Sequence, residues 1–220
     1  MRIHIRLSKN RETVPFNYQE KQVSQLHTWI GRDNDLHGKL SLYSFSWLKK
    51  GDLIPKRGWN FPYGTEYFIS SHQPDIIKKI IERIQQDNYF GYGMEVNSLS
   101  LQQDPYFEEK QRFLVGSPVF IKRKEAERFQ FYFPGEERSD SFLTETLQTK
   151  LVEAGLPPEG VKVEFDKNYK NPTQNGVSYK GIFNKGSICP VIVSGSSEQV
   201  AFAWNVGVGN STGIGFGALI

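Results

Sequence analysis

Hydrophobic and polar residues alternate at the start of the chain. In residues 2–7 (RIHIRL), an isoleucine or leucine occupies every second position, and a basic residue or histidine occupies the positions between. This period of two residues is typical of a strand with one buried face. Residues 42–48 (LYSFSWL) alternate in the same way, and residues 65–70 (TEYFIS) and 93–101 (GMEVNSLSL) are further candidate strands.

Between these strands, apolar residues recur at the spacing of a helix. Val23, Leu26 and Ile30 follow one another at intervals of three and four residues, and the next residue, Gly31, is of a type that commonly ends a helix. Residues 73–86 carry a stripe of isoleucines with a proline in the first turn, which also favours a helix. The order β-α-β-β-α-β predicts that residues 1–101 form a ferredoxin-like unit.

The second half of the chain repeats this plan with little sequence identity. The polar stretch that opens residues 102–116 predicts a linker, and residues 117–220 predict a second ferredoxin-like unit with extra strands. The fold class is therefore α+β: tandem ferredoxin-like (RRM-like) units, each an antiparallel sheet with helices on one face. The expected strands of the second unit are 118–123, 128–133, 161–166, 177–184 and 189–195, and its expected helices are 139–155 and 196–207.

Composition and charge limit the kinds of partner and metal site that the chain can have. The chain has 220 residues, a net charge of +3 and a pI of about 8.8, which permits a polyanionic partner without requiring one. Its single cysteine, Cys189, excludes an intrachain disulfide and a thiolate metal cluster, as expected for a cytoplasmic protein. The sequence offers no cluster of carboxylates for metal catalysis, and no apolar run long enough for a membrane span. We therefore expect no metal, no cofactor and no membrane partner.

Five glycines crowd the end of the chain, in GVGNSTGIGFG. A dinucleotide-binding motif would require a full helix after them, but few residues follow. Two interpretations remain of equal weight: a structural turn between the last helix and the last strand, or a cradle in which bare backbone N–H groups bind phosphates. The residues concerned are Gly207, Gly209, Gly213, Gly215 and Gly217.

Two histidines and a lysine form a candidate catalytic set. His27 lies at the edge of the apolar stripe of the first predicted helix, and His37 lies in a loop two residues before Lys39. Each histidine alone is most simply a structural or surface residue. Together with the lysine, they could cleave RNA, which needs a base for the 2′-hydroxyl, an acid for the 5′-oxygen and a cation for the phosphorane.

A basic cluster lies at the start of the second unit. Lys122, Arg123 and Lys124 fall between two predicted strands, so that a β-hairpin carrying them could contact an RNA stem. Most surface lysines are simply solvated, and the signal from composition alone is weak. These three residues are candidate RNA-binding residues.

The spacing of the glycines resembles the signature of a known family, the CRISPR-associated endoribonucleases that process repeat RNA (the Cas-six family of the RAMP superfamily). The segments RIHIRL, VPFNYQ and SPVFI also resemble the starts of the family's two units. The resemblance implies metal-independent cleavage that leaves a 2′,3′-cyclic phosphate and a 5′-hydroxyl. It also implies that His37 is catalytic, that Lys39 assists, and that His27 stands where some members have a tyrosine.

The expected function is therefore the cleavage of CRISPR repeat RNA to make guide RNAs. The main alternative is a non-catalytic RAMP scaffold that binds RNA as a subunit of a CRISPR effector complex. A generic RNA-binding module of the RRM type ranks lower, because GYGMEV matches the required aromatic motif only weakly. Expected partners are the repeat RNA, effector complex subunits and a second copy of the chain.

Overall fold

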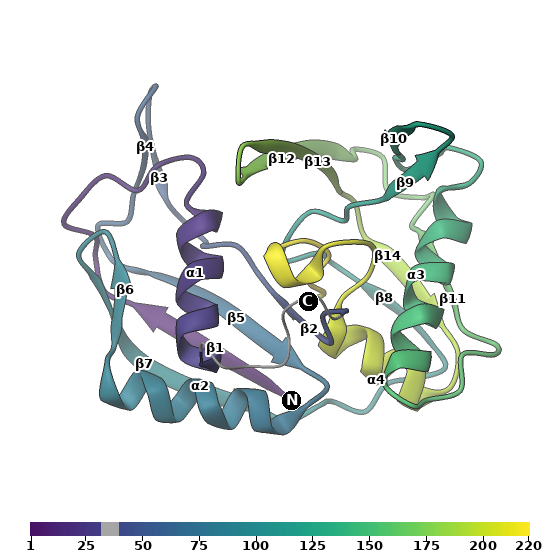
Figure 1. The fold of residues 1–220 in the computed structure, drawn as a ribbon, viewed down its shortest axis with the longest axis horizontal. Helices are drawn as coiled ribbons and strands as arrows, with labels where there is room; N and C mark the ends of the chain where they lie inside the picture. Colours follow the sequence, from purple (N-terminus) through teal and green to yellow (C-terminus); the bar gives the residue numbers. More distant parts are fainter. Residues whose placement is uncertain (32–39) are drawn as a thin grey trace.

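The computed structural model describes residues 1–31 and 40–220. Figure 1 shows two units side by side, each with a sheet and helices packed on it. The antiparallel sheets and the alternation of strands and helices confirm the α+β class predicted from the sequence.

The first unit is built on a sheet of five strands in the order β2-β5-β1-β7-β6. Its main elements follow the β-α-β-β-α-β order predicted from the sequence, with β3 and β4 as an inserted hairpin and β6 as a short edge strand. The bounds are β1 (Arg2–Leu7), α1 (Gln19–Ile30), β2 (Tyr43–Phe45), β3 (Asp52–Ile54), β4 (Gly58–Asn60), β5 (Thr65–Ser71), α2 (Pro74–Gln86), β6 (Tyr89–Gly91) and β7 (Met94–Gln102).

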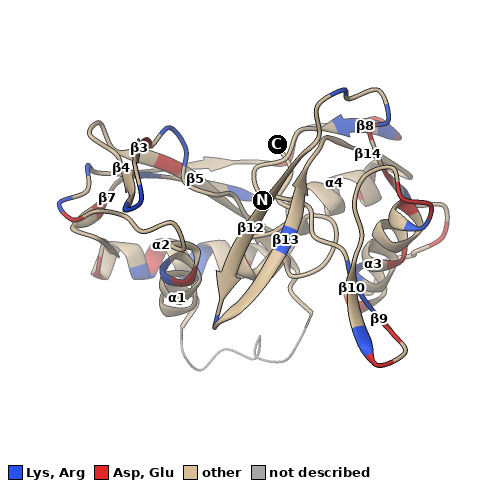
Figure 2. Cartoon of the chain, turned by 90° about the horizontal axis from the view of Figure 1, so that it is seen from above, with Lys and Arg blue, Asp and Glu red and all other residues tan. Residues whose placement is uncertain are grey.

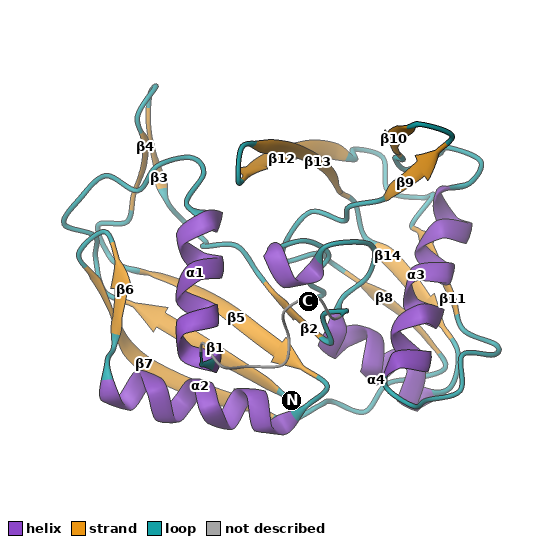
Figure 3. Cartoon of the chain, viewed as in Figure 1, coloured by secondary structure: helices purple, strands orange, loops and turns teal. Residues whose placement is uncertain are grey.

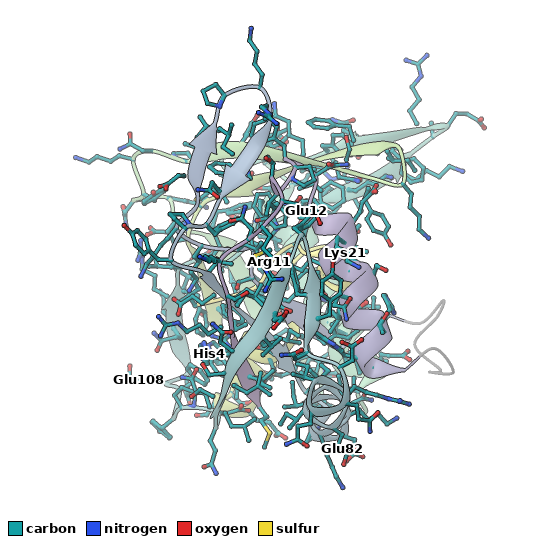
Figure 4. All side chains as sticks on the ribbon, turned by 90° about the vertical axis from the view of Figure 1, so that its left-hand side faces the viewer. His4, Arg11, Glu12, Lys21, Glu82 and Glu108 are labelled. Carbon is teal, nitrogen blue, oxygen red and sulfur yellow. The ribbon has the colours of Figure 1, made fainter. Side chains whose placement is uncertain are left out.

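The alternation in β1 explains how this unit packs. Ile3, Ile5 and Leu7 are buried in the core beneath α1 and α2, which cover one face of the sheet. The isoleucine stripe of α2 joins the same core. His4 points to the opposite face, and Figure 4 shows it across the sheet from Lys21 of α1.

The second unit has a smaller sheet, in the order β11-β14-β8, and two separate hairpins. Where a fourth strand of this sheet would lie, a single bridge joins Val115 to Leu219. The bounds are β8 (Lys110–Phe113), β9 (Lys122–Glu125), β10 (Arg128–Phe131), α3 (Ser139–Glu153), β11 (Lys162–Phe165), β12 (Thr173–Tyr179), β13 (Ile182–Ile188), β14 (Val191–Ser194), α4 (Ser197–Val206) and a 3-10 turn η1 (Thr212–Ile214).

Two predicted boundaries differ from those observed. The second sheet takes its first strand, β8, from residues 110–113 of the predicted linker, whereas β9 starts only at Lys122 and pairs with β10 alone. Residues 177–184 are not one strand but the end of a hairpin, which turns at Lys180 and Gly181. Both turn residues have a left-handed backbone, with φ of 49° and 76°, the conformation that a two-residue hairpin loop requires.

The two units contact each other at the N-terminus. The guanidinium of Arg2 lies between the rings of Phe68 and Trp204, 3.8 and 3.6 Å from their centroids. It donates hydrogen bonds to the backbone oxygens of Trp204 and Leu219, at 3.3 and 2.7 Å. The first strand and the last residues of the chain are therefore held together.

Candidate active site

His27 borders an open hollow between the two units. The hollow has a volume of about 630 Å³ and is formed by α1 on one side and the β12–β13 turn on the other. His27 lies in the last turn of α1 and is half-buried. Across the hollow, Tyr179 and Lys180 belong to the hairpin turn. The backbone N–H of Lys180 donates to Glu20 Oε1 at 2.6 Å, which ties the turn to the first turn of α1.

The other two predicted catalytic residues, His37 and Lys39, lie outside the described residues. The described chain stops at Gly31, directly after α1, and resumes at Leu40, three residues before β2. The roles of His37 and Lys39 therefore stay predictions from the sequence.

The glycine-rich segment packs against the first unit. Its 3-10 turn η1 contacts both α1 and β2, and Gly215 accepts a hydrogen bond on its backbone oxygen from Trp47 Nε1 at 2.7 Å. Gly207, Gly209 and Gly217 belong to the same folded segment and are buried.

Close backbone packing accounts for these glycines. At Gly217, an added Cβ would lie 1.9 Å from the oxygen of Val208, and at Gly209 it would lie 2.5 Å from the oxygen of Phe120. Gly207 and Gly215 also have positive φ, of 71° and 92°. The geometry gives a physical reason for the structural interpretation, and contact between this backbone and RNA stays a prediction. Gly213 is buried as well, and an added Cβ there would overlap Ser41 Oγ.

A buried lysine that the sequence did not single out supports this segment. Lys150 of α3 donates hydrogen bonds to the backbone oxygens of Val206 and Gly207, at 3.1 and 3.2 Å, and to Thr212 Oγ1 at 3.1 Å. Burial lowers the pKa of Lys150 from 10.5 to about 7. Lys150 stands next to Leu151 in α3, and no local motif distinguishes it from the other lysines of the chain.

The three predicted RNA-binding residues on β9 differ in their surroundings. Arg123 is occupied within the protein: it donates to the oxygen of Phe142 at 2.7 Å, to Thr146 Oγ1 at 2.9 Å and to Asn210 Oδ1 at 3.1 Å. Its guanidinium is thus a link between β9, α3 and the glycine-rich segment.

Lys122 and Lys124 are placed differently. Lys122 Nζ lies 4.0 Å above the ring of Phe129, which is itself exposed, and Lys124 is exposed on the same hairpin. Figure 2 shows basic and acidic positions mixed along β9 and β10. Contact between these two lysines and RNA stays a prediction.

Within residues 1–31 and 40–220, no group of three or more histidine, cysteine, aspartate or glutamate side chains could hold a metal ion. None of the helices in these two ranges is both long and apolar enough to cross a bilayer.

Solved structures share this architecture. A structure described as a RAMP protein binding different RNA substrates superposes with a TM-score of 0.84 at 22% identity, covering 100% of this chain and 99% of the other. A structure of a Cas6-related protein from Pyrococcus furiosus gives a TM-score of 0.86 at 24% identity, covering 100% of this chain and 97% of the other. The chain therefore has the fold of these two structures.

The sequence comparisons identify the family. A CRISPR-associated endoribonuclease-like protein Cas6 of Pyrococcus furiosus is 25% identical, covering 99% of this chain and 97% of the relative. A protein of Pyrococcus horikoshii described as endoribonuclease-like Cas6nc is 24% identical, with 99% and 98% covered. The family model for the C-terminal part of the CRISPR associated protein Cas6 matches residues 101–219. The chain belongs to the Cas6 family, as the glycine signature predicted.

Proposed function

We propose that this protein is a metal-independent endoribonuclease that cleaves CRISPR repeat RNA to produce guide RNAs. The observation that carries the proposal is the position of His27, which borders an open hollow at the end of α1. His37 and Lys39 follow this helix in the sequence, seven and nine residues after its last residue, Ile30. The relatives of this chain support RNA as the substrate.

The proposed reaction uses the nucleophile that RNA itself carries. The 2′-oxygen forms a bond to the adjacent phosphorus, and the bond from phosphorus to the 5′-oxygen breaks. One histidine accepts the proton of the 2′-hydroxyl, and the other gives a proton to the departing 5′-oxygen. Lys39 is proposed to stabilise the negative charge of the phosphorane. The products are a 2′,3′-cyclic phosphate and a 5′-hydroxyl.

The test is cleavage of repeat RNA from the genome that encodes the chain. His37→Ala and His27→Ala are each expected to slow single-turnover cleavage by about 10²–10⁴-fold, the usual contribution of an acid or base. RNA binding should change much less, and chelator should not stop the wild-type reaction. His4→Asn is the matched control, because His4 lies on the opposite face of the sheet. Wild-type rates in both histidine variants would contradict the proposed mechanism.

A second candidate is RNA binding without cleavage, as a scaffold in a CRISPR effector complex. It is favoured by the RAMP structure of the same fold, which is described by its binding of different RNA substrates. The distinguishing substrate carries a 2′-deoxy nucleotide just upstream of the cut. A nuclease of the proposed type would bind this RNA and leave it intact, yet cut the unmodified RNA. A scaffold would bind both and cut neither.

A further inference from the structure

A second cavity, distinct from the hollow at His27, lies at the N-terminal end of α1. It has a volume of about 400 Å³ and lies between the chain that enters α1, the β3–β4 hairpin and the start of β12. Its walls include the rings of Phe16, Trp47 and Trp59. Phe16 is 48% exposed and meets Trp59 edge to face, with ring centroids 5.9 Å apart. Open aromatic faces of this kind bind flat, unsaturated ligands by stacking.

A polar group at the same cavity lacks a partner. Gln19, the first residue of α1, lines the cavity and is only 2% exposed. Within residues 1–31 and 40–220, no group donates a hydrogen bond to its buried Oε1. A buried acceptor without a donor is unfavourable, so this position favours a ligand that brings an N–H group.

Lys50 brings a positive charge to the cavity. It also lines a neighbouring cavity, together with Arg6, Lys49, Asp52 and Glu66. Lys49 is partly neutralised by Glu66 at 3.9 Å. A ligand that combines a flat ring, N–H donors and a negative charge matches this arrangement, and a nucleotide has all three.

We infer that this cavity binds one unpaired base of the RNA substrate, with the base against Phe16 and Trp59, an N–H of its edge toward Gln19, and its phosphate near Lys50. The base must be unpaired, because stacking on a side chain and contact with its edge both require that it leaves the duplex. This inference rests on the proposed function, since it assumes that RNA is the substrate.

The location of the cavity relates it to the proposed active site. Gln19 and His27 are eight residues apart on α1, which corresponds to about 12 Å along the helix axis. β12 runs beside the same helix, from Asn175 at the cavity to Tyr179 at the hollow. An RNA strand following α1 and β12 would thus have one base held a short distance from the phosphate to be cut.

The decisive experiment is an abasic scan of the RNA combined with Phe16→Leu. Each unpaired nucleotide is replaced in turn by an abasic one, and the affinity is measured for wild-type and variant protein. We expect one position at which base removal weakens wild-type binding about five- to 150-fold, the range for base–aromatic stacking. Phe16→Leu should weaken binding of intact RNA by a similar factor, and should have no further effect on RNA abasic at that position.

Gln19→Met supplies an independent readout. If Gln19 only packs, removing its unpartnered acceptor should leave RNA binding unchanged. If it contacts the base, affinity should fall several-fold while the melting temperature stays the same or rises. Tyr106→Leu, which changes an exposed aromatic residue outside the cavity, should be neutral.

The outcomes separate this inference from the proposed function. If the wild-type protein binds no repeat RNA, both are overturned. If it binds RNA but the Phe16 and abasic losses simply add, or the Gln19 variant binds normally, the base-binding site is overturned and the proposed function stands.

Discussion

Lys150 shows how one residue supports a segment that lies far away in the sequence. Its ammonium group satisfies two backbone oxygens at the end of α4 and one side chain of η1. The helix end carries partial negative charge, which favours a cation there. Burial opposes the charged form, and the net result is a pKa of about 7 in the folded protein.

This shift predicts a pH dependence of stability. The pKa of Lys150 is 10.5 unfolded and about 7 folded, so the unfolded chain binds more protons between these values. The free energy of unfolding should therefore rise as pH increases above about 7, by at most about 1.4 kcal/mol per pH unit. Urea unfolding at pH 6.5 and 8.5 measures the effect, and Lys150→Met should lack this contribution. An equal rise in the variant would assign the effect to other groups.

Close packing makes Gly217 sensitive to substitution. Gly217→Ala would force the backbone at Val208 to move, since the new Cβ would overlap its oxygen. We expect a loss of about 2–4 kcal/mol in the free energy of unfolding. Gly155→Ala is the matched control: Gly155 also has positive φ but no atom within 4 Å of the added Cβ. It should cost only about 1–2 kcal/mol. Equal losses would show that conformation, and not packing, requires Gly217.

The β12–β13 hairpin brings a positive charge to the hollow. Lys180 sits at its turn, and the hairpin is held to α1 through Glu20. Lys180→Asn should keep the turn, because asparagine tolerates the left-handed conformation, but should remove one positive charge. RNA affinity is expected to fall and its salt dependence to decrease by about one phosphate contact. Lys79→Asn, on the exposed side of α2, is the control. An unchanged salt dependence for the Lys180 variant would place RNA elsewhere.

The elements differ in how well the sequence predicted them, for physical reasons. β1 and α2 bury one continuous face, so their periodicity is visible in the residues. β8 reads KQRF and buries only Phe113, so its role as a strand comes from pairing with β14 and leaves little periodic signal. The β12–β13 hairpin buries few residues of β12, and the sequence pattern predicts one strand across its turn at Lys180 and Gly181.

The same limit applies to the candidate site. The glycine spacing and His27 were visible as a motif and as a position on a helix. Other features depend on residues that are far away in the chain. They are the hydrogen bonds of Lys150, those of Arg123, and the lack of a donor for the side-chain oxygen of Gln19. No local pattern encodes such contacts, because they are set by how segments that are distant in the sequence pack together.

Arg2 links the two units, because it lies on β1 and donates hydrogen bonds to Trp204 and Leu219. It is 3% exposed, and burial lowers its pKa to about 9, although Asp104 opposes the shift. The sequence predicted only that its side chain lies on the outer face of β1. The second unit covers that face at Arg2, through Trp204 and Leu219.

Replacing Arg2 tests whether this contact holds the two units together. Arg2→Met would keep much of the apolar stem but leave the oxygens of Trp204 and Leu219 without their donor. We expect the free energy of unfolding to fall by about 2–4 kcal/mol. Arg6→Met, on the same face of β1 but exposed, should change it by less than about 0.5 kcal/mol. Because a lost contact between units lets one unfold before the other, the variant should also unfold in a broader transition in urea, with a lower apparent m-value. Equal stability of the two variants would show that the units associate without Arg2.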